Sequence, residues 1–216
     1  MKQKVFGIGL QRTGTTTLME CLRAVDYKVA EFSMNLLFDY RLGKSIPTII
    51  YLMNFDAAQD LPYALQYKEL DKSFPNSKFI LTTRKDEETW YKSKMYHGLR
   101  GEPVHIRNKV MINLMVYGKP AALTDKIRFM NKYNEHNERV REYFKNKDNF
   151  LEICWEKGDT YETVYKFLGL KEPYPEIPEN EPIVYPTYKK LLIKAESDPN
   201  RYFNVDTDMD IGYLDG

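Results

Sequence analysis

The chain has 216 residues, of which 43% are hydrophobic and 29% charged, and this composition predicts one globular domain with its own core. Its 32 basic and 31 acidic residues leave a net charge of +1. That balance excludes a field of one sign for general nucleic-acid binding, so any anion site must be built locally from a few groups.

Strands and helices alternate along the chain. The strands are short apolar or β-branched runs, predicted at residues 5–10, 28–30, 78–83 and 150–154. The helices follow apolar repeats of three to four residues, predicted at 15–24, 61–73, 87–98, 102–120, 124–145 and 159–167. This alternation predicts a three-layer α/β fold with a mainly parallel central sheet.

Several of these helices carry signals at their ends. Pro62 suits the first turn of the helix at 61–73, and Asp86 can cap the helix that runs to Gly98. Asp159 and Glu162 form a capping pair for a helix that ends at Gly169. The buried stripe of the helix at 124–145 is predicted to contain Ile127, Met130, Tyr133, Val140 and Phe144.

The chain is expected to form one α/β domain over residues 1–180. The proline-rich segment 181–216 is expected to be a C-terminal extension that wraps the same domain, while 31–59 shows no clean periodicity. The N-terminus has no apolar stretch typical of a signal peptide, and the most apolar segment is too short and broken to cross a bilayer. Cys21 and Cys154 suit a reduced interior, so we expect a cytoplasmic protein without stable membrane insertion.

A glycine-rich turn separates the first predicted strand from the first predicted helix. The segment Gly9-Leu-Gln-Arg-Thr-Gly14-Thr-Thr16 follows the phosphate-loop pattern G-x-x-x-x-G-K-[ST], with Thr15 in place of the Lys. Glycines let backbone amides face inward as an anion nest, and the helix N-terminus adds its dipole. Arg12 supplies a cation from within the loop. The alternative is an ordinary glycine turn without a ligand.

This loop resembles the 5′-phosphosulfate loop of sulfotransferases, which use 3′-phosphoadenosine 5′-phosphosulfate (PAPS). In the branch that it most resembles, the loop reads G-x-x-R-T-G-T-x-S-L, and Arg12 to Leu18 follow that pattern. The resemblance implies that Arg12 binds the 5′-phosphate and the bridging oxygen. It implies a cofactor cradle formed by Gly9, Gln11, Arg12, Thr13, Gly14, Thr15, Thr16 and Thr17.

A second matching segment is the strand end at Arg84 and the following helix with Ser93. The family places an Arg and a Ser there, both on the 3′-phosphate of the cofactor, and guanidinium groups suit that anion. The spacing here is nine residues, where the family usually has eight. The alternative for Arg84 is a surface ion pair with Asp86 or Glu88.

The catalytic base is the third expectation. Many sulfotransferases carry His-x-Pro before this strand, and the branch resembled here carries Asp-x-Pro, which matches Asp60-Leu-Pro62. By resemblance, Asp60 accepts the proton of the acceptor hydroxyl. The alternative is that Asp60 only caps the next helix. The rival bases are Asp56, Glu69, His97 and His105.

A fourth matching segment is Cys154-Trp-Glu-Lys-Gly-Asp159, followed by Phe167-Leu-Gly169. The resemblance implies that Trp155 stacks on the adenine and that Lys157 adds to the positive field around the phosphates. Trp155 as an ordinary core residue is the alternative.

These motifs together predict a PAPS-dependent sulfotransferase that transfers a sulfuryl group to a hydroxyl or amine of a small-molecule or glycan acceptor. We expect no metal, because no His, Cys or carboxylate cluster has ligand spacing, and no nucleic-acid partner. The rival functions are a phosphate-loop kinase of a small metabolite, which should carry the missing Lys, and a nucleotide-binding module without a working base. The motifs specify neither the acceptor nor an oligomeric state.

Overall fold

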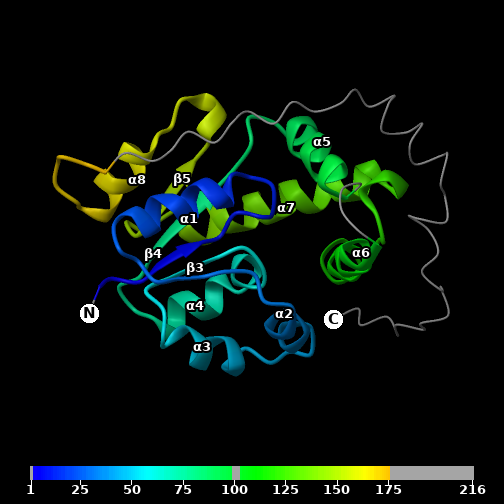
Figure 1. Cartoon of the computed structure of the whole chain (residues 1–216), viewed down its shortest axis with the longest axis horizontal. Helices are drawn as coiled ribbons and strands as arrows, with labels where there is room; N and C mark the ends of the chain where they lie inside the picture. Colours follow the sequence, from blue (N-terminus) through cyan, green and yellow to red (C-terminus); the bar gives the residue numbers. More distant parts are fainter. Residues whose placement is uncertain (1, 99–102, 176–216) are drawn as a thin grey trace.

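A computed structural model describes residues 2–98 and 103–175, apart from the side chains of 103–106 and Leu123. The predicted extension at 181–216, and its boundary with the domain at 1–180, lie outside the described residues. The described chain forms a central sheet with helices on both faces, which confirms the predicted α/β class (Figure 1).

All five strands of the sheet run parallel, in the order β2-β3-β1-β4-β5. β1 lies in the middle and pairs with β3 on one side and β4 on the other. The strands are β1 (Val5–Gly7), β2 (Val29–Ala30), β3 (Ala57–Gln59), β4 (Lys78–Thr82) and β5 (Phe150–Ile153). Since the strands are parallel, the loops that follow them meet at one edge of the sheet, which we call the carboxyl edge.

The helices connect the strands and cover the sheet. The α-helices are α1 (Thr15–Ala24), α2 (Met34–Arg41), α3 (Ile46–Leu52), α4 (Tyr67–Ser73), α5 (Glu87–Gly98), α6 (Pro103–Tyr117), α7 (Lys126–Phe144) and α8 (Tyr161–Leu168). Short 3-10 helices occur at η1 (Tyr63–Leu65), η2 (Ala122–Thr124) and η3 (Trp155–Lys157).

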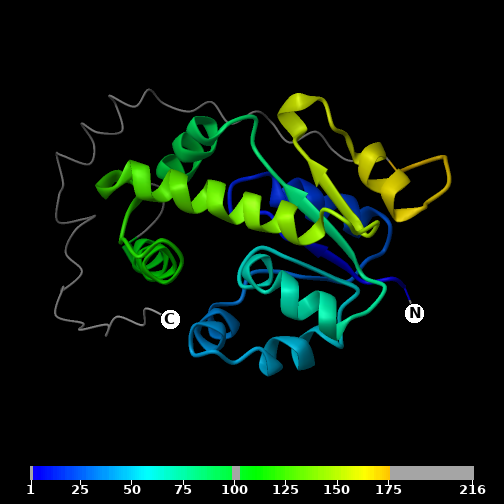
Figure 2. The same cartoon turned by 180° about the vertical axis from the view of Figure 1, so that it is seen from behind.

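Alternating side chains of the strands build two separate hydrophobic layers. Val5 and Ile80 pack with α1 and α8, whereas Phe6 and Phe79 pack with α4 and α7. Figures 1 and 2, which view the molecule from opposite sides, show α1 and α7 on opposite faces of the sheet. The result is the predicted three-layer arrangement.

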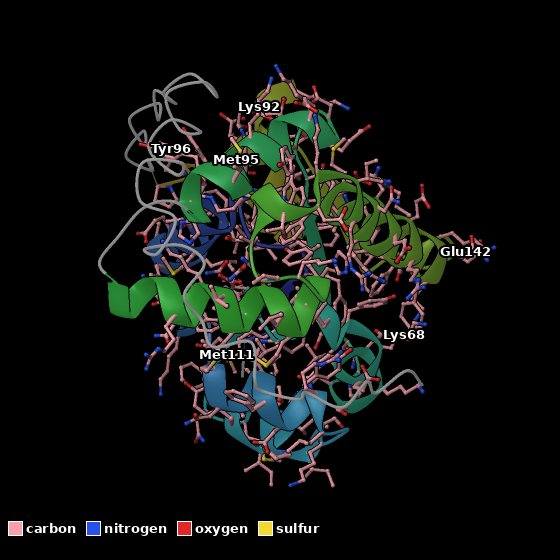
Figure 3. All side chains as sticks on the ribbon, turned by 90° about the vertical axis from the view of Figure 1, so that its right-hand side faces the viewer. Lys68, Lys92, Met95, Tyr96, Met111 and Glu142 are labelled. Atoms are coloured by element: carbon pink, nitrogen blue, oxygen red, sulfur yellow. The ribbon has the colours of Figure 1, made fainter. Side chains whose placement is uncertain are left out.

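A third hydrophobic cluster lies beyond the carboxyl edge, between α5, α6 and the first half of α7. Trp90 stacks on Tyr133 with ring centroids 4.6 Å apart, and Tyr117 stacks on Phe129 at 4.3 Å. Figure 3 looks onto this region, with Met95 and Tyr96 labelled on α5 and Met111 on α6. This cluster supports α5 and α6 above the strand ends.

The structure corrects part of the predicted secondary structure. The segment at 31–59 contains α2, α3 and β3, and the predicted helix at 61–73 is divided into η1 and α4, with Pro62 before η1. The helix at 15–24 and the cap of α5, in which Asp86 accepts a hydrogen bond from the Thr89 amide at 2.6 Å, are confirmed.

The predicted roles of three side chains are wrong. Ile127 is 72% exposed, and Phe129 occupies the buried stripe of α7 instead, because side chains two residues apart on a helix point to nearly opposite sides. Thr160 and Thr163 cap α8 in place of Asp159 and Glu162. The Asp159 carboxylate accepts a hydrogen bond from the Cys154 amide at 2.7 Å, so it stabilises the turn before the helix.

Within residues 2–98 and 103–175, no helix is long and apolar enough to cross a membrane.

Candidate active site

The predicted site residues meet at the carboxyl edge, around the end of the central strand. The chain leaves β1 toward β2 and β3 on one side and later fills β4 and β5 on the other, so the sheet order reverses at β1. Open parallel sheets bind ligands in the crevice beyond such a reversal. The loops after β1, β3, β4 and β5 carry Arg12, Asp60, Arg84 and Trp155 to this edge.

The loop after β1 has the backbone of an anion nest. Arg12 and Gly14 both have positive φ angles, 72° and 91°, with Thr13 between them. Alternation of this kind turns successive amide groups toward one side. Helix α1 then begins without a side-chain cap and without an acidic residue in its first turn, which leaves its amide groups and dipole for an external anion.

Close packing against β4 holds this loop in place. A Cβ atom at Gly9 would lie less than 3.0 Å from Thr82 Oγ1 and from Thr13 Oγ1, so only glycine fits there. Thr13 is fully buried, and its Oγ1 donates to the Leu10 carbonyl at 2.6 Å and lies 2.6 Å from Thr82 Oγ1. The Thr13 hydroxyl is therefore committed to the loop itself, and its backbone amide is the group that remains for a ligand.

His136 on α7 binds the backbone at Ile8, where the chain leaves β1 and enters the loop. The sequence analysis did not single out this residue. Its Nε2 lies 2.8 Å from the Ile8 carbonyl oxygen, and because that oxygen only accepts, Nε2 carries the hydrogen. Burial lowers the pKa of His136 to about 4, so the ring is neutral at pH 7.

Trp155 contacts the loop from the β5 side. Its Nε1 donates to the Gly14 carbonyl at 3.2 Å, and a Cβ atom at Gly14 would collide with the indole ring. The half-buried ring thus covers the loop at the start of α1. Lys157, at the end of η3, is exposed.

Arg84 joins the loop to the turn after β5. Its guanidinium forms two hydrogen bonds to Glu156, at 2.6 and 3.0 Å, and a third to the Arg12 carbonyl at 3.3 Å. The alternative partners considered from sequence, Asp86 and Glu88, are engaged elsewhere: Asp86 caps α5 and Glu88 forms an ion pair with Lys126. Arg84 is therefore part of the site's framework.

Ser93 contacts the loop residue Arg12. The Arg12 Nε donates to Ser93 Oγ at 3.2 Å, and Ser93 is fully buried on α5. The residue eight positions before Ser93 is Lys85, which is exposed and whose amide donates to Glu156 at 3.0 Å. The loop between β4 and α5 thus contains two adjacent cationic residues, Arg84 and Lys85.

Asp60 directly follows β3 and has a left-handed backbone, with a φ of 71°. Its Oδ1 accepts from the Leu61 amide at 2.7 Å, and η1, which begins at Tyr63 after Pro62, has no side-chain cap. Asp60 therefore does not cap the following helix. Burial raises the pKa of Asp60, while the Leu61 amide, Lys94, Gln11 and Arg12 oppose that shift.

Lys94 is a site residue that the sequence analysis missed. It is only 4% exposed, and its Nζ donates to Gln11 Oε1 at 2.9 Å and lies 4.8 Å from the Tyr117 ring centroid. Burial lowers the pKa of Lys94 to about 7, although Asp60 acts in the opposite direction. The available signal was its spacing from Trp90 and Tyr91, which places a Lys on the apolar face of α5.

Two buried tyrosine hydroxyls complete this side of the site. In the part of the chain that the structure describes, the hydroxyls of Tyr63 and Tyr117 have no hydrogen-bond partner. The pKa of each is raised, first by burial and further by the charge of Asp60. Buried polar atoms without partners are few in native proteins, and a catalytic or ligand-binding role is one explanation for them.

The rival bases lie elsewhere or outside the described side chains. Asp56 precedes β3, at the opposite edge of the sheet from Asp60, and accepts from the Lys28 amide. The charge of Glu69 acts on Tyr40 and Tyr67. His97 lies near the end of α5, and the side chain of His105 is outside the described residues.

Among the described residues, no group of three His, Cys, Asp or Glu side chains could hold a metal ion.

Comparison with known proteins identifies the family. The model of the "Sulfotransferase domain" family matches residues 49–182, which is more than half of the chain. The chain belongs to the sulfotransferase family. The family match therefore supports a transferase, and it covers Asp60, Arg84, Ser93 and Trp155.

One solved sulfotransferase shares the fold, and a second is a weaker structural match. One from Alicyclobacillus acidocaldarius has 14% sequence identity and a TM-score of 0.54, with 94% of each chain covered. A mouse sulfotransferase, SULT7A1, complexed with PAP has 18% identity and a TM-score of 0.45, covering 97% of this chain and 68% of that one. A comparison with curated protein sequences finds no match.

Proposed function

We propose that this sulfotransferase transfers the sulfuryl group of PAPS to a hydroxyl group of a small-molecule or glycan acceptor. The observation that carries the proposal is the meeting of an anion nest and a carboxylate at one edge of the sheet. The nest follows β1 and Asp60 follows the neighbouring strand β3, and both Gln11 and Arg12 favour the charged form of Asp60 by lowering its pKa. A phosphosulfate held in the nest would therefore have its sulfur close to a proton acceptor.

The residues present fit the proposed donor. The positive φ angles at Arg12 and Gly14 and the uncapped start of α1 suit its 5′-phosphate. Arg84 and Lys85 offer cations for its 3′-phosphate at the end of β4, and Trp155 offers an aromatic ring for its adenine. Thr15 stands where a triphosphate-binding loop has Lys, so the pattern favours a phosphosulfate over a triphosphate.

The reaction forms a bond between the acceptor oxygen and sulfur, and breaks the bond between sulfur and the 5′-phosphate oxygen. Asp60 would take the proton of the acceptor hydroxyl, which its raised pKa favours. The backbone amides of the loop and the Arg12 guanidinium would bind the charge that develops on the departing phosphate oxygen. Fixed donors of this kind usually supply the largest share of catalysis.

A binding experiment tests the donor, and a single substitution tests the base. We expect adenosine 3′,5′-bisphosphate (PAP) to bind the full chain in calorimetry, in preference to ATP with magnesium. We then expect Asp60→Asn to retain this affinity and to lower PAP release from PAPS by roughly 10²–10⁴-fold, the usual range for a general base. PAP release is measured without added acceptor and with a panel of phenols, alcohols and sugars.

Asn suits the left-handed backbone of Asp60, so the variant should fold normally. Asp56→Asn is the matched control, because that carboxylate lies at the opposite edge of the sheet and should not affect turnover. Unchanged turnover in Asp60→Asn would assign the base to another residue. Preference for ATP with magnesium would favour a kinase, and PAP binding without turnover on any acceptor would favour a non-catalytic module.

A further inference from the structure

The geometry around Lys94 connects the anion nest to the proposed base. Lys94 reaches from α5 to the loop, where its Nζ donates to Gln11 Oε1 at 2.9 Å. Its charge acts on Asp60 and on Arg12. The ammonium group therefore interacts electrostatically with Arg12, which would bind the donor, and with Asp60, the proposed base.

The hydrogen bond from Lys94 also fixes the orientation of the Gln11 amide. Because the ammonium can only donate, it must face the oxygen of the amide. The NH₂ group of Gln11 is then left to donate to other groups, and Gln11 also opposes the rise in the pKa of Asp60. Gln11 is thus hydrogen-bonded to Lys94 and coupled electrostatically to Asp60.

The charges in this cluster favour an added anion. Arg12 and Lys94 carry two positive charges and Asp60 one negative charge, and Lys109 adds a further positive influence on Lys94. Lys94 is almost fully buried, and its Nζ donates a hydrogen bond to the neutral side-chain amide of Gln11. A buried cation is costly unless it is paired with a charge or strongly hydrogen-bonded, so a ligand with negatively charged oxygens would stabilise it.

We propose that Lys94 is a catalytic residue whose ammonium binds the non-bridging oxygens of the transferring sulfuryl group. This inference rests on the proposed function, and it adds a second cation to Arg12. Thr15 stands where the phosphate-loop pattern has Lys, and Lys94 on α5 supplies an ammonium group beside Gln11 of the same loop. The charge remains beside the sulfur throughout the transfer, while Arg12 binds the departing oxygen.

The experiment compares two ligands that differ only in the sulfuryl group. PAPS carries that group and PAP does not, so a residue that binds it should distinguish the two. We expect Lys94→Met to weaken PAPS binding about tenfold or more, the usual cost of losing a hydrogen bond to a charged group, and to change PAP binding by less than about twofold. Calorimetry at pH 6.5, where Lys94 is charged, measures both affinities.

Lys92→Met is the matched control on the same helix. The Lys92 side chain is 60% exposed and lies 3.9 Å from Glu88, so its replacement should leave both affinities unchanged. A thermal melt of each variant checks folding, and Lys94→Met should have an equal or higher melting temperature because it removes a buried charge.

The possible outcomes separate this inference from the proposed function. Equal weakening of PAPS and PAP would overturn it by giving Lys94 a structural or phosphate-binding role. No weakening of either would overturn it by removing Lys94 from the site. In both cases PAP binding and turnover by the wild-type chain would still support the proposed function, which fails separately if the wild type binds no PAP.

Discussion

The two sides of the candidate site differ in how their polar groups are satisfied. On the loop side, hydrogen bonds from neighbouring elements fix the backbone. Trp90 donates to the Gln11 carbonyl, Trp155 to the Gly14 carbonyl and Arg84 to the Arg12 carbonyl. On the Asp60 side, the hydroxyls of Tyr63 and Tyr117 are buried without a partner in the described structure.

This difference separates a preformed binding surface from a reactive one. The backbone of the loop side is preorganised, because side chains bind its carbonyl groups and leave its amide groups for the ligand. The Asp60 side holds charges and hydroxyls in a buried environment, where their pKa values shift. Substitutions on the loop side should therefore affect PAP binding and stability, whereas those on the Asp60 side should spare PAP binding and affect turnover or the binding of the sulfuryl group.

Substitution of Arg12 tests whether one residue contributes to both sides of the site. Its loss should have the largest effect on turnover. Arg12→Ala should lower PAP release from PAPS by about 10²–10³-fold, because losing one donor to a developing oxyanion costs about 3–4 kcal/mol. Arg12 has a positive φ, so Arg12→Gly is the companion variant that avoids backbone strain. Near-normal turnover in both variants would remove Arg12 from the catalytic machinery.

His136 tests the support beneath the loop. Burial holds its pKa at about 4, below the ordinary 6.5, with a smaller contribution from Arg139. Between these pH values the unfolded chain binds the proton and the folded chain does not, so stability decreases as the pH falls. The expected loss is about 3 kcal/mol from pH 6.5 to 4.

Urea unfolding at pH 7 and pH 4.5 measures this effect. In His136→Gln, which retains a donor for the Ile8 carbonyl, the part of the pH dependence due to the imidazole should disappear. The same acid sensitivity in both proteins would assign it to other groups.

The two cations at the end of β4 test the loop side further, with the smallest expected effect. If Arg84 binds the 3′-phosphate, Arg84→Ala should weaken PAP binding about tenfold, and it should also release Glu156. If Lys85 is the ligand, as the eight-residue spacing to Ser93 favours, Lys85→Ala should have the larger effect. Calorimetry with PAP and with adenosine 5′-monophosphate, which lacks the 3′-phosphate, distinguishes them.

The sequence predicted those parts of the fold that depend on local patterns. Apolar periodicity located α1 and β4 to within about one residue, and Gly169 correctly marked the end of α8, where its φ is 76°. The segment at 31–59 gave no signal, since α2 and α3 are short, with several large hydrophobic residues exposed on them. Ile127 misled because its spacing of three residues from Met130 fits a helical stripe, whereas the face that is buried contains Phe129.

The predicted site followed the same division. The backbone geometry near Gly9 and Gly14 could be predicted from the sequence, because close approach and positive φ angles require glycine at these positions. The role of Lys94 could not be predicted, since its position depends on how α5 packs across the carboxyl edge rather than on a motif. Tyr63 and Tyr117 come from distant segments, and only the folded chain gives them a common neighbour in Asp60.

The left-handed backbone at Asp60 has a consequence for how this site can evolve. Among residues with a side chain, Asp, Asn and His are the ones enriched at positive φ. Two of these three, Asp and His, have side chains that act as general bases in enzymes. Asp and His codons differ by a single nucleotide, so one point mutation could exchange the chemistry of the base while the turn keeps its shape.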